Sequence, residues 1–471
     1  MELFRELKKY GEKDIYPYHM PGHKRKGQSY FPKEMAAIDL TEVDGTDNLH
    51  EPEGIIKEAQ EYCAKEVGAD RSYFLVNGST AGVLAAISAV AAPGNKILIA
   101  RNAHRSAYNA IAIRNLNPVY IFPETDEEWN FCKAVTPEEV RRSFKENPDV
   151  AAVFIVSPTY EGCICRVKEI ADAVHEYGIP LIVDEAHGAH LPFIKGSELS
   201  ACRAGADIVI QSTHKTLPAP TQTALLHLNG SIADRYKIEK FLKIYQSSSP
   251  SYPLMAGIDG SIRLMASEGD RLLRQLRERF SKLVQKINEE LEYIRAYPYT
   301  KDEQDAGKLL VSASKNRKLF LTGKELACIL RERFGAETEM STERYVLAMF
   351  TVSDDTGAYY RLFDALKAID DDLKERVSKG YEGKDFQKIT IPLPEISLSP
   401  GNALEAETEE IPPEESKGRI SADFIGLYPP GTPLLSGGEK ITAEYTEIIK
   451  KYLSEGLGVS GLKDNRIRVV R

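Results

Sequence analysis

The sequence predicts an α/β fold with a large, mostly parallel sheet covered by helices, and three observations support this prediction. Short β-branched runs alternate with helical segments between about residues 70 and 230. Most of these runs are apolar throughout, which is typical of strands that are buried on both faces. After about residue 255 the pattern changes, and a smaller α+β region is expected beyond residue 265.

Seven apolar runs are interpreted as strands of the large sheet: residues 72–76, 96–100, 118–122, 151–156, 180–184, 207–210 and 223–228. Residues 167–175 place apolar side chains at helical spacing and precede Gly178, a common helix stop. A long charged helix is expected over residues 261–296, and a last amphipathic helix over about residues 440–454. Residues 394–418 are rich in Pro and Glu, so we expect a connecting stretch whose acidic cluster at 405–415 is solvated.

The composition excludes several classes of protein. The chain has 471 residues, of which 42% are hydrophobic and 28% are charged, as in ordinary globular proteins. Its net charge of −9 argues against broad nucleic-acid binding, which needs an excess of Lys and Arg to neutralise phosphates. The longest mostly apolar run, residues 83–93, is too short to span a bilayer, and the N-terminus lacks the apolar stretch of a secretory signal. Six cysteines without zinc-site spacing are expected to be free thiols, so we predict a cytoplasmic protein without a metal site or a membrane partner.

Polar residues follow four of the predicted strands, at the carboxyl ends where open α/β sheets bind their ligands. Gly78, Ser79 and Thr80 open a helix, and such a turn offers backbone N–H groups and hydroxyls to a phosphate. An ordinary helix cap explains the same residues. The other three strands are followed by Arg101-Asn102-Ala103-His104, by Asp184-Glu185-Ala186-His187 and by Ser212-Thr213-His214-Lys215.

These residue types together suit one cofactor, pyridoxal 5′-phosphate. Lys215 can form a Schiff base, the flat ring of His104 can stack on an aromatic heterocycle, and the carboxylate of Asp184 can hold a pyridine nitrogen protonated. One histidine at a strand end is more often structural than catalytic, but three such strand ends on one rim are harder to dismiss.

The sequence also resembles the Orn/Lys/Arg decarboxylases, a branch of the fold-type-I pyridoxal-phosphate enzymes, over nearly its whole length. The motifs that carry the resemblance are Pro21-Gly22-His23-Lys24, Asp47-Asn48-Leu49-His50, Ile56-Lys57-Glu58-Ala59-Gln60, Gly78-Ser79-Thr80, Arg101-Asn102-Ala103-His104, Asp184-Glu185-Ala186-His187, Ser212-Thr213-His214-Lys215, Ser249-Pro250-Ser251-Tyr252 and Tyr428-Pro429-Pro430-Gly431. Because the first motif begins at Pro21, the resemblance implies a short form without the N-terminal wing domain of the largest members.

The resemblance implies a role for each candidate residue. Lys215 carries the cofactor, Asp184 pairs with the pyridine nitrogen and His104 stacks on the ring. His187 lies near the 3′-oxygen, and His214 or Lys215 returns a proton to Cα. The phosphate is held by Ser79, Thr80, Ser212 and His214, and Gly78 and Ala186 complete the cofactor-binding set. Ser247 corresponds to a phosphate contact from the partner subunit, which implies a homodimer with the active site at its interface.

The implied reaction is decarboxylation of a basic L-amino acid, namely arginine, lysine or ornithine, to agmatine or a diamine, as in polyamine biosynthesis. Asp47 and Glu439 are candidates for binding the cation at the far end of the substrate, although a solvated surface acid is at least as good an interpretation of either. Ser399-Pro400-Gly401 and Ser436-Gly437-Gly438-Glu439 depart from the family pattern and leave the substrate preference open.

Two other functions stay open at this point. One is an aminotransferase or another amino-acid lyase on the same fold, because a fold does not set the reaction type. An aminotransferase usually needs an arginine on the substrate carboxylate. The other is a catalytically silent regulatory homologue, against which the presence of Lys215, His104 and Asp184 argues.

We therefore predict a fold-type-I, transferase-like large domain followed by a smaller α+β C-terminal region. The expected parts are residues 1–40 as a segment at the dimer and active-site interface, 41–265 as the cofactor-binding large domain, 266–393 as a small α+β domain and 394–471 as a decarboxylase-type C-terminal domain.

Overall fold

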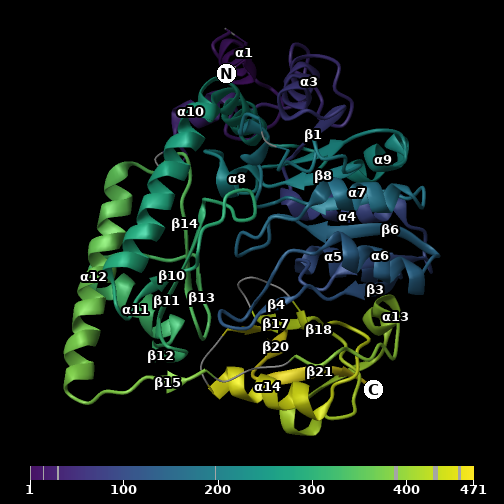
Figure 1. Cartoon of the computed structure of the whole chain (residues 1–471). Helices are drawn as coiled ribbons and strands as arrows, with labels where there is room; N and C mark the ends of the chain where they lie inside the picture. Colours follow the sequence, from purple (N-terminus) through teal and green to yellow (C-terminus); the bar gives the residue numbers. More distant parts are fainter. Residues whose placement is uncertain are drawn as a thin grey trace. The chain divides into compact units, whose positions relative to one another are not determined.

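The computed structural model describes residues 2–13, 15–28, 31–196, 198–386, 391–427, 433–454 and 458–471 (Figure 1). The chain forms two compact units, each built from several segments of the sequence. The first unit comprises Met1–Ala92, Val140–Ser157 and Arg166–Leu273, and the second comprises Pro93–Glu139, Pro158–Cys165 and Arg274–Arg471. The motif Tyr428-Pro429-Pro430-Gly431 lies outside the described residues. The predicted domain boundaries stay predictions.

Five strands of the first unit neighbour one another in the order β1 (Arg71–Leu75), β9 (Ala224–Leu228), β8 (Ile208–Gln211), β7 (Leu181–Asp184) and β6 (Val150–Val156). Strands β6, β7 and β8 pair in parallel, whereas β9 pairs antiparallel with both β8 and β1. Every residue of β7, β8 and β9 is buried, as the apolar runs in the sequence indicate. The predicted α/β fold with a mostly parallel sheet is confirmed.

The helices of the first unit are α1 (Glu2–Gly11), α2 (Lys33–Ile38), α3 (Ile55–Val67), α4 (Gly78–Val90), α7 (Val167–His175), α8 (Thr213–Thr216) and α9 (Arg235–Tyr245), with the short 3-10 turn η1 (Leu191–Phe193). Helix α7 has the bounds that the sequence predicts. Helix α4 approaches the strands closely at Gly82, where a Cβ atom would meet Leu75 Cδ1 at 2.7 Å. The absence of a side chain at Gly82 therefore allows α4 to pack close to the strands.

Helix α10 (Tyr252–Glu290) is continuous and begins nine residues before the predicted start at residue 261. Its first turn contains Pro253, and a proline is tolerated there because the missing N–H has no helical partner. The helix also ends earlier than predicted. The N–H groups of Glu292, Tyr293 and Ile294 instead donate to the buried carboxylate of Asp370.

The second unit begins with β2 (Lys96–Ala100) and β3 (Asn117–Ile121), which pair in parallel and are joined by α5 (Arg105–Ile113). The short strands β4 (Thr125–Asp126) and β5 (Phe131–Cys132) form a hairpin. Helix α6 (Pro137–Glu146) follows it, and from Val140 onward its residues belong to the first unit. All seven predicted strands of the large sheet are therefore present, with bounds that differ from the prediction by one residue at most.

A further sheet of this unit has the order β13 (Met340–Ser341), β14 (Val346–Met349), β11 (Lys308–Lys315), β12 (Lys318–Leu321) and β15 (Lys384–Asp385), and β10 (Arg295–Ala296) pairs with β11. The C-terminal part of α10, α11 (Gly323–Phe334) and α12 (Thr356–Ser378) share one hydrophobic core with these strands (Figure 1). The α+β region expected after residue 265 is thus present.

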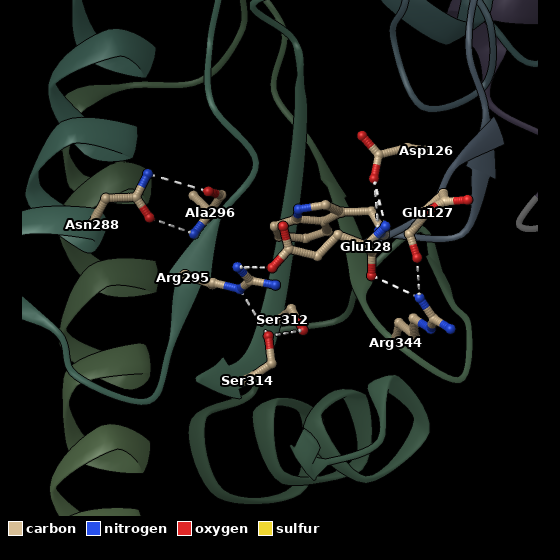
Figure 2. A network of polar contacts seen from close by, with 10 residues as sticks. Asp126, Glu127, Glu128, Asn288, Arg295, Ala296, Ser312, Ser314 and Arg344 are labelled. Atoms are coloured by element: carbon tan, nitrogen blue, oxygen red, sulfur yellow. Dashed lines mark hydrogen bonds and ion pairs between the residues drawn. The ribbon is translucent and has the colours of Figure 1, made fainter. Parts of the chain in front are cut away.

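A polar network connects the β4–β5 hairpin to this sheet (Figure 2). Arg295 forms an ion pair of 2.5 Å with Glu128 and donates to Ser314 Oγ at 2.8 Å. Arg344 donates to the backbone carbonyls of Glu127 and Glu128 at 2.7 and 2.8 Å. These contacts attach the hairpin to the helix-covered sheet within the same unit.

The C-terminal part of the second unit contains α13 (Pro400–Glu405), β16 (Thr408–Ile411), the 3-10 turn η2 (Pro413–Glu415), β17 (Ile425–Leu427), β18 (Pro433–Leu435), α14 (Ala443–Ser454), β19 (Val459–Ser460), β20 (Leu462–Lys463) and β21 (Arg466–Val470). The prediction of a connecting stretch over residues 394–418 is wrong. Strand β16 pairs with β21, and Glu409 and Glu410 form ion pairs with Arg419 and Arg468. Because β16 stands at the end of its sheet, charged side chains there are an ordinary protection of an edge strand.

Within the described ranges, no helix combines the length and the apolar character that a membrane crossing requires.

Candidate active site

Residues at the carboxyl ends of β7 and β8 lie together in the first unit. These strands are parallel neighbours, so their ends meet at one edge of the sheet. Asp184 ends β7, and Lys215 lies in α8 directly after β8. The Nζ atom of Lys215 is 3.1 Å from Nε2 of His187, a residue of the loop after β7. The structure thus brings Lys215 and His187 into contact, as candidate residues of one site.

Asp184 provides a carboxylate in a nearly dry environment, because only 5% of the residue is exposed. Its Oδ1 accepts the N–H of Ala186 at 3.1 Å, which orients the carboxylate. Ala186 is itself buried. A buried carboxylate of this kind favours a cationic partner, such as a protonated ring nitrogen, by direct charge attraction.

Two turns provide the groups that the sequence predicts for a phosphate. Gly78 has φ +73, a conformation that glycine adopts easily, and it starts α4 with Ser79 and Thr80 in the first turn. Ser212 directly precedes α8 and is fully buried. Its Oγ has no hydrogen-bond partner among the described residues. A buried hydroxyl without a partner is costly, so this atom calls for a polar group from a ligand.

His214 is held in one orientation by the backbone. Its Nδ1 lies 2.8 Å from the carbonyl oxygen of Thr223, which makes Nδ1 the protonated nitrogen of the neutral ring and Nε2 an acceptor. Burial lowers the pKa of His214, and the neighbouring charge of Lys215 lowers it further. The neutral ring is therefore favoured at neutral pH.

Ser247 lies in the exposed loop after α9. Its N–H donates to Oδ1 of Asn77 at 3.1 Å, and its carbonyl is 2.8 Å from Nε2 of His50. These contacts place Ser247 beside the residue that precedes Gly78. Its role towards a partner subunit stays a prediction.

His104 belongs to the second unit, where it caps the N-terminus of α5. Its Nδ1 lies 3.2 Å from the N–H and 2.9 Å from the hydroxyl of Ser106, while the residue as a whole is exposed. The cap fixes the ring at the start of the helix. Stacking of this ring on a cofactor stays a prediction.

Asp47, a candidate for binding the substrate cation, is hydrogen-bonded to nearby backbone N–H groups. Its carboxylate accepts N–H groups from the turn before α3 and from the first residues of that helix, namely Asn48, Glu53, Gly54, Ile56 and Lys57. The residue is only 7% exposed. These contacts give Asp47 the role of a helix cap rather than that of a solvated surface acid.

Glu439, the second candidate, is buried in the second unit against Arg101. The guanidinium donates to both carboxylate oxygens, at 2.5 and 2.9 Å. In the sequence, Arg101 stands out only as part of the motif Arg101-Asn102-Ala103-His104, and nothing in the local pattern connects it with a residue 338 positions away.

A buried hydrogen-bond chain in the first unit is not predictable from the sequence. Gln211 Nε2 donates to Glu185 at 2.5 Å, and Gln211 Oε1 lies 3.1 Å from Nε2 of His227. Nδ1 of His227 is 2.7 Å from Ser72 Oγ. Burial raises the pKa of Glu185 to about 8 and lowers that of His227 to about 3. Both side chains are therefore largely neutral at pH 7. The only signal in the sequence is that Glu185 and Gln211 directly adjoin Asp184 and Ser212.

The residues of the first unit fit pyridoxal phosphate. A lysine amine, a buried carboxylate and a buried hydroxyl without a partner are the groups that bind its aldehyde, its ring nitrogen and its phosphate. Lys215, Asp184 and Ser212 would supply them.

Known proteins match the chain over its whole length. The family model described as the major domain of Orn/Lys/Arg decarboxylases matches residues 2–316, and the model of their C-terminal domain matches residues 384–456. The arginine decarboxylase of Bacillus subtilis (strain 168) is 34% identical over 492 aligned residues, covering 100% of this chain and 97% of that protein. The constitutive lysine decarboxylase of Escherichia coli (strain K12) is 27% identical and covers 88% of this chain and 70% of its own length.

The fold is shared with solved structures as well. The crystal structure of the lysine decarboxylase of Francisella novicida superposes with a TM-score of 0.83 at 21% identity, over 100% of this chain and 81% of that one. The family models match most of the sequence, and the Bacillus subtilis relative is 34% identical over the full length, so the chain belongs to the Orn/Lys/Arg decarboxylase family.

Proposed function

We propose that the protein uses pyridoxal phosphate to decarboxylate L-arginine to agmatine and CO₂. The observation that carries the choice of arginine is the 34% identity, over essentially the full length of both chains, with a relative named arginine decarboxylase. The relative named lysine decarboxylase is 27% identical and is matched over a smaller share of its length.

The buried groups of the first unit support this chemistry. Bound pyridoxal phosphate supplies a ring that accepts the electron pair left on Cα when CO₂ departs. Asp184 supplies the negative charge that keeps a ring nitrogen protonated. Lys215 supplies the amine for covalent attachment, and its hydrogen bond to His187 gives Nζ a partner to which a proton passes.

His214 is suited to a proton transfer because its ring is neutral and oriented. The bond from Nδ1–H to the carbonyl of Thr223 leaves Nε2 as the basic nitrogen. A lowered pKa makes the protonated form of Nε2 a stronger acid than ordinary histidine, so it releases its proton more readily. We therefore propose two donors to Cα: Nε2 of His214, after it has taken up a proton from solvent, or the protonated Nζ of Lys215.

Loss of CO₂ requires that the substrate carboxylate is not clamped by an arginine. Arg101, three residues before His104, is engaged on both terminal nitrogens by Glu439 and by the Leu434 carbonyl. This arrangement supports decarboxylation over transamination, because this guanidinium already has its carboxylate.

We also propose a cytoplasmic homodimer with the active site at its interface, acting in polyamine biosynthesis. The exposed position of Ser247 beside Asn77 supports the dimer, since the residue is accessible to a second copy. Sedimentation of the holoenzyme at micromolar concentration tests it. A monomer that turns over at full rate would contradict the shared site.

The proposed reaction is tested by incubating the purified protein with pyridoxal phosphate and separately with arginine, lysine and ornithine, while CO₂ and amine are measured. Agmatine from arginine is the expected result. A diamine from lysine or ornithine alone would replace the substrate, a keto acid would indicate transamination, and no amine from any of the three would refute the proposal.

Two variants locate the site in the same assay. Lys215→Ala should release no amine, and borohydride reduction should no longer attach the cofactor to the chain. Lys195→Ala, a change of an exposed lysine in the same unit, is the matched control and should behave as the wild type. Attachment that persists in Lys215→Ala would show that another lysine holds the cofactor.

A further inference from the structure

The ion pair between Arg101 and Glu439 connects the loop that carries His104 with the C-terminal part of the second unit. We propose that these two are positioning residues, which hold the loop of residues 101–104 so that the His104 ring is fixed for catalysis. The proposal rests on the proposed function, and it gives Glu439 a role other than contact with the substrate.

The pair is a buried, bidentate salt bridge. The side chains of Arg101 and Glu439 are 10% and 1% exposed. Nη1 and Nη2 of the arginine each meet a different carboxylate oxygen, at 2.5 and 2.9 Å. Such parallel bonds set an orientation as well as a distance, because they fix the guanidinium plane against the carboxylate plane.

The C-terminal partner is itself held rigidly. Glu439 Oε2 also accepts the N–H of Ser436 at 2.9 Å, and Nη2 of Arg101 donates to the Leu434 carbonyl at 3.1 Å. Gly438 has φ +89, and a Cβ atom there would stand 2.2 Å from the Leu398 carbonyl oxygen. The turn from Ser436 to Glu439 therefore needs glycine at position 438 to aim the carboxylate at Arg101.

The loop around Arg101 is pinned at its backbone too. The N–H of Arg101 donates to the Ile121 carbonyl at 2.8 Å, and its own carbonyl accepts the hydroxyl of Tyr108 at 2.8 Å. The guanidinium lies 4.5 Å from the ring centre of Tyr120. With backbone and side chain both fixed, little freedom is left to His104, which starts α5 three residues later.

The same C-terminal part contacts both ends of α5. At the start of the helix, Phe424 packs edge-on against Tyr108 at 5.7 Å between ring centres and lies under the guanidinium of Arg105 at 5.6 Å. Beyond the end of the helix, Ser399 Oγ donates to Asn115 Oδ1 at 2.8 Å. Together with the buried ion pair of Arg101, these contacts hold the helix that His104 caps.

A buried ion pair is an expensive way to obtain stability alone, since apolar residues of similar size often stabilise as well or better. The directional clamp provides orientation, which an apolar contact does not. A positioning role and a merely structural role therefore make different predictions. If the pair positions His104, breaking it changes kcat and the surroundings of the bound cofactor even in folded protein. If the pair is only structural, folded protein keeps both unchanged.

The experiment compares Glu439→Gln, which removes the charge but keeps the shape, with wild type and with His104→Ala. We measure kcat and KM for arginine, the induced circular dichroism of bound pyridoxal phosphate and Tm. The matched control is Glu410→Gln, which removes one carboxylate from the exposed pair with Arg468 in the same unit.

We expect Glu439→Gln to lower kcat by about ten- to a hundredfold, with KM within about twofold, because a small misplacement of a positioned group costs that much. Its cofactor circular dichroism should change in the same direction as that of His104→Ala, and the control should match wild type. A folded Glu439→Gln protein with unchanged kcat and unchanged dichroism, and only a lower Tm, would overturn the proposal.

A second variant and a readout that is independent of turnover complete the test. If Glu439→Gln does not fold, Arg101→Lys is read in the same way, since lysine keeps the charge but cannot bridge both oxygens. If the wild type releases no amine from any basic amino acid, the proposed function fails. The dichroism still decides the positioning role, because a change in the variant supports it and no change overturns it.

Discussion

Replacing Glu185 by glutamine tests the charge of the hydrogen-bond chain that lies behind the candidate site. Glu185 is fully buried, and burial raises its pKa to about 8 even though the Ala201 N–H and the Gln211 amide both lower it. A carboxyl group with this pKa is mostly protonated at pH 7. The folded protein therefore carries an acid directly beside Asp184 without a second buried negative charge.

The expected effect on stability follows from proton linkage. The folded pKa is about 8 and the reference pKa is 4.5, so the folded state binds the proton more tightly than the unfolded state. Stability from this group is fully present below pH 4.5 and is lost as the pH rises through 8. At about 1.4 kcal/mol per pH unit, the loss between pH 6 and pH 8 is about 2 kcal/mol.

Urea denaturation of wild type and Glu185→Gln at pH 6, 7 and 8 measures this loss. Glutamine has nearly the same shape and does not titrate, so other titrating groups cancel in the difference between the two proteins. The free energy of unfolding of the wild type should fall by about 2 kcal/mol relative to the variant over this range. The exposed change Glu405→Gln should keep a constant difference. A constant difference for Glu185→Gln as well would refute the protonated state of Glu185.

Three further variants probe other features. Asp47→Ala removes the acceptor of five N–H groups and should lower the free energy of unfolding by about 1 to 3 kcal/mol in urea, with KM for arginine unchanged; a large rise in KM would instead restore Asp47 as a substrate ligand. Ser212→Ala should weaken pyridoxal-phosphate affinity roughly tenfold in a fluorescence titration, because the hydroxyl no longer meets the phosphate, and an unchanged affinity would remove Ser212 from the site. Phe280→Ala leaves a cavity where α10 packs on the second unit's core and should cost about 3 to 5 kcal/mol of unfolding free energy in urea, whereas a loss below about 1 kcal/mol would show that this core repacks.

The parts of the fold that the sequence predicts well are those where residue composition and spacing indicate burial. The runs that form β7 and β8 are apolar on both faces, which is typical of a strand between two layers. The sequence predicts both ends of helix α7 because its apolar spacing and Gly178 agree. In the same way, Lys215 and His187 could be expected to meet, since parallel neighbours end at one edge.

The features that could not be predicted depend on residues that are distant in the sequence. The acidic stretch around Glu409 reads as solvated linker until β21 pairs with it. Glu439 gives no local sign that its partner is Arg101, 338 residues away. Sequence patterns describe the surroundings of each residue along the chain, whereas these contacts are made across the fold.

The ion pair between Arg101 and Glu439 also affects the order in which the second unit folds during synthesis. Arg101 leaves the ribosome 338 residues before its partner, an interval of about 20 to 70 s at 5–20 residues per second. During that time its guanidinium stays hydrated, because burying an unpaired cation costs several kcal/mol. The Arg101 side chain therefore reaches its buried position only after Glu439 has emerged, and the second unit completes its packing at that point.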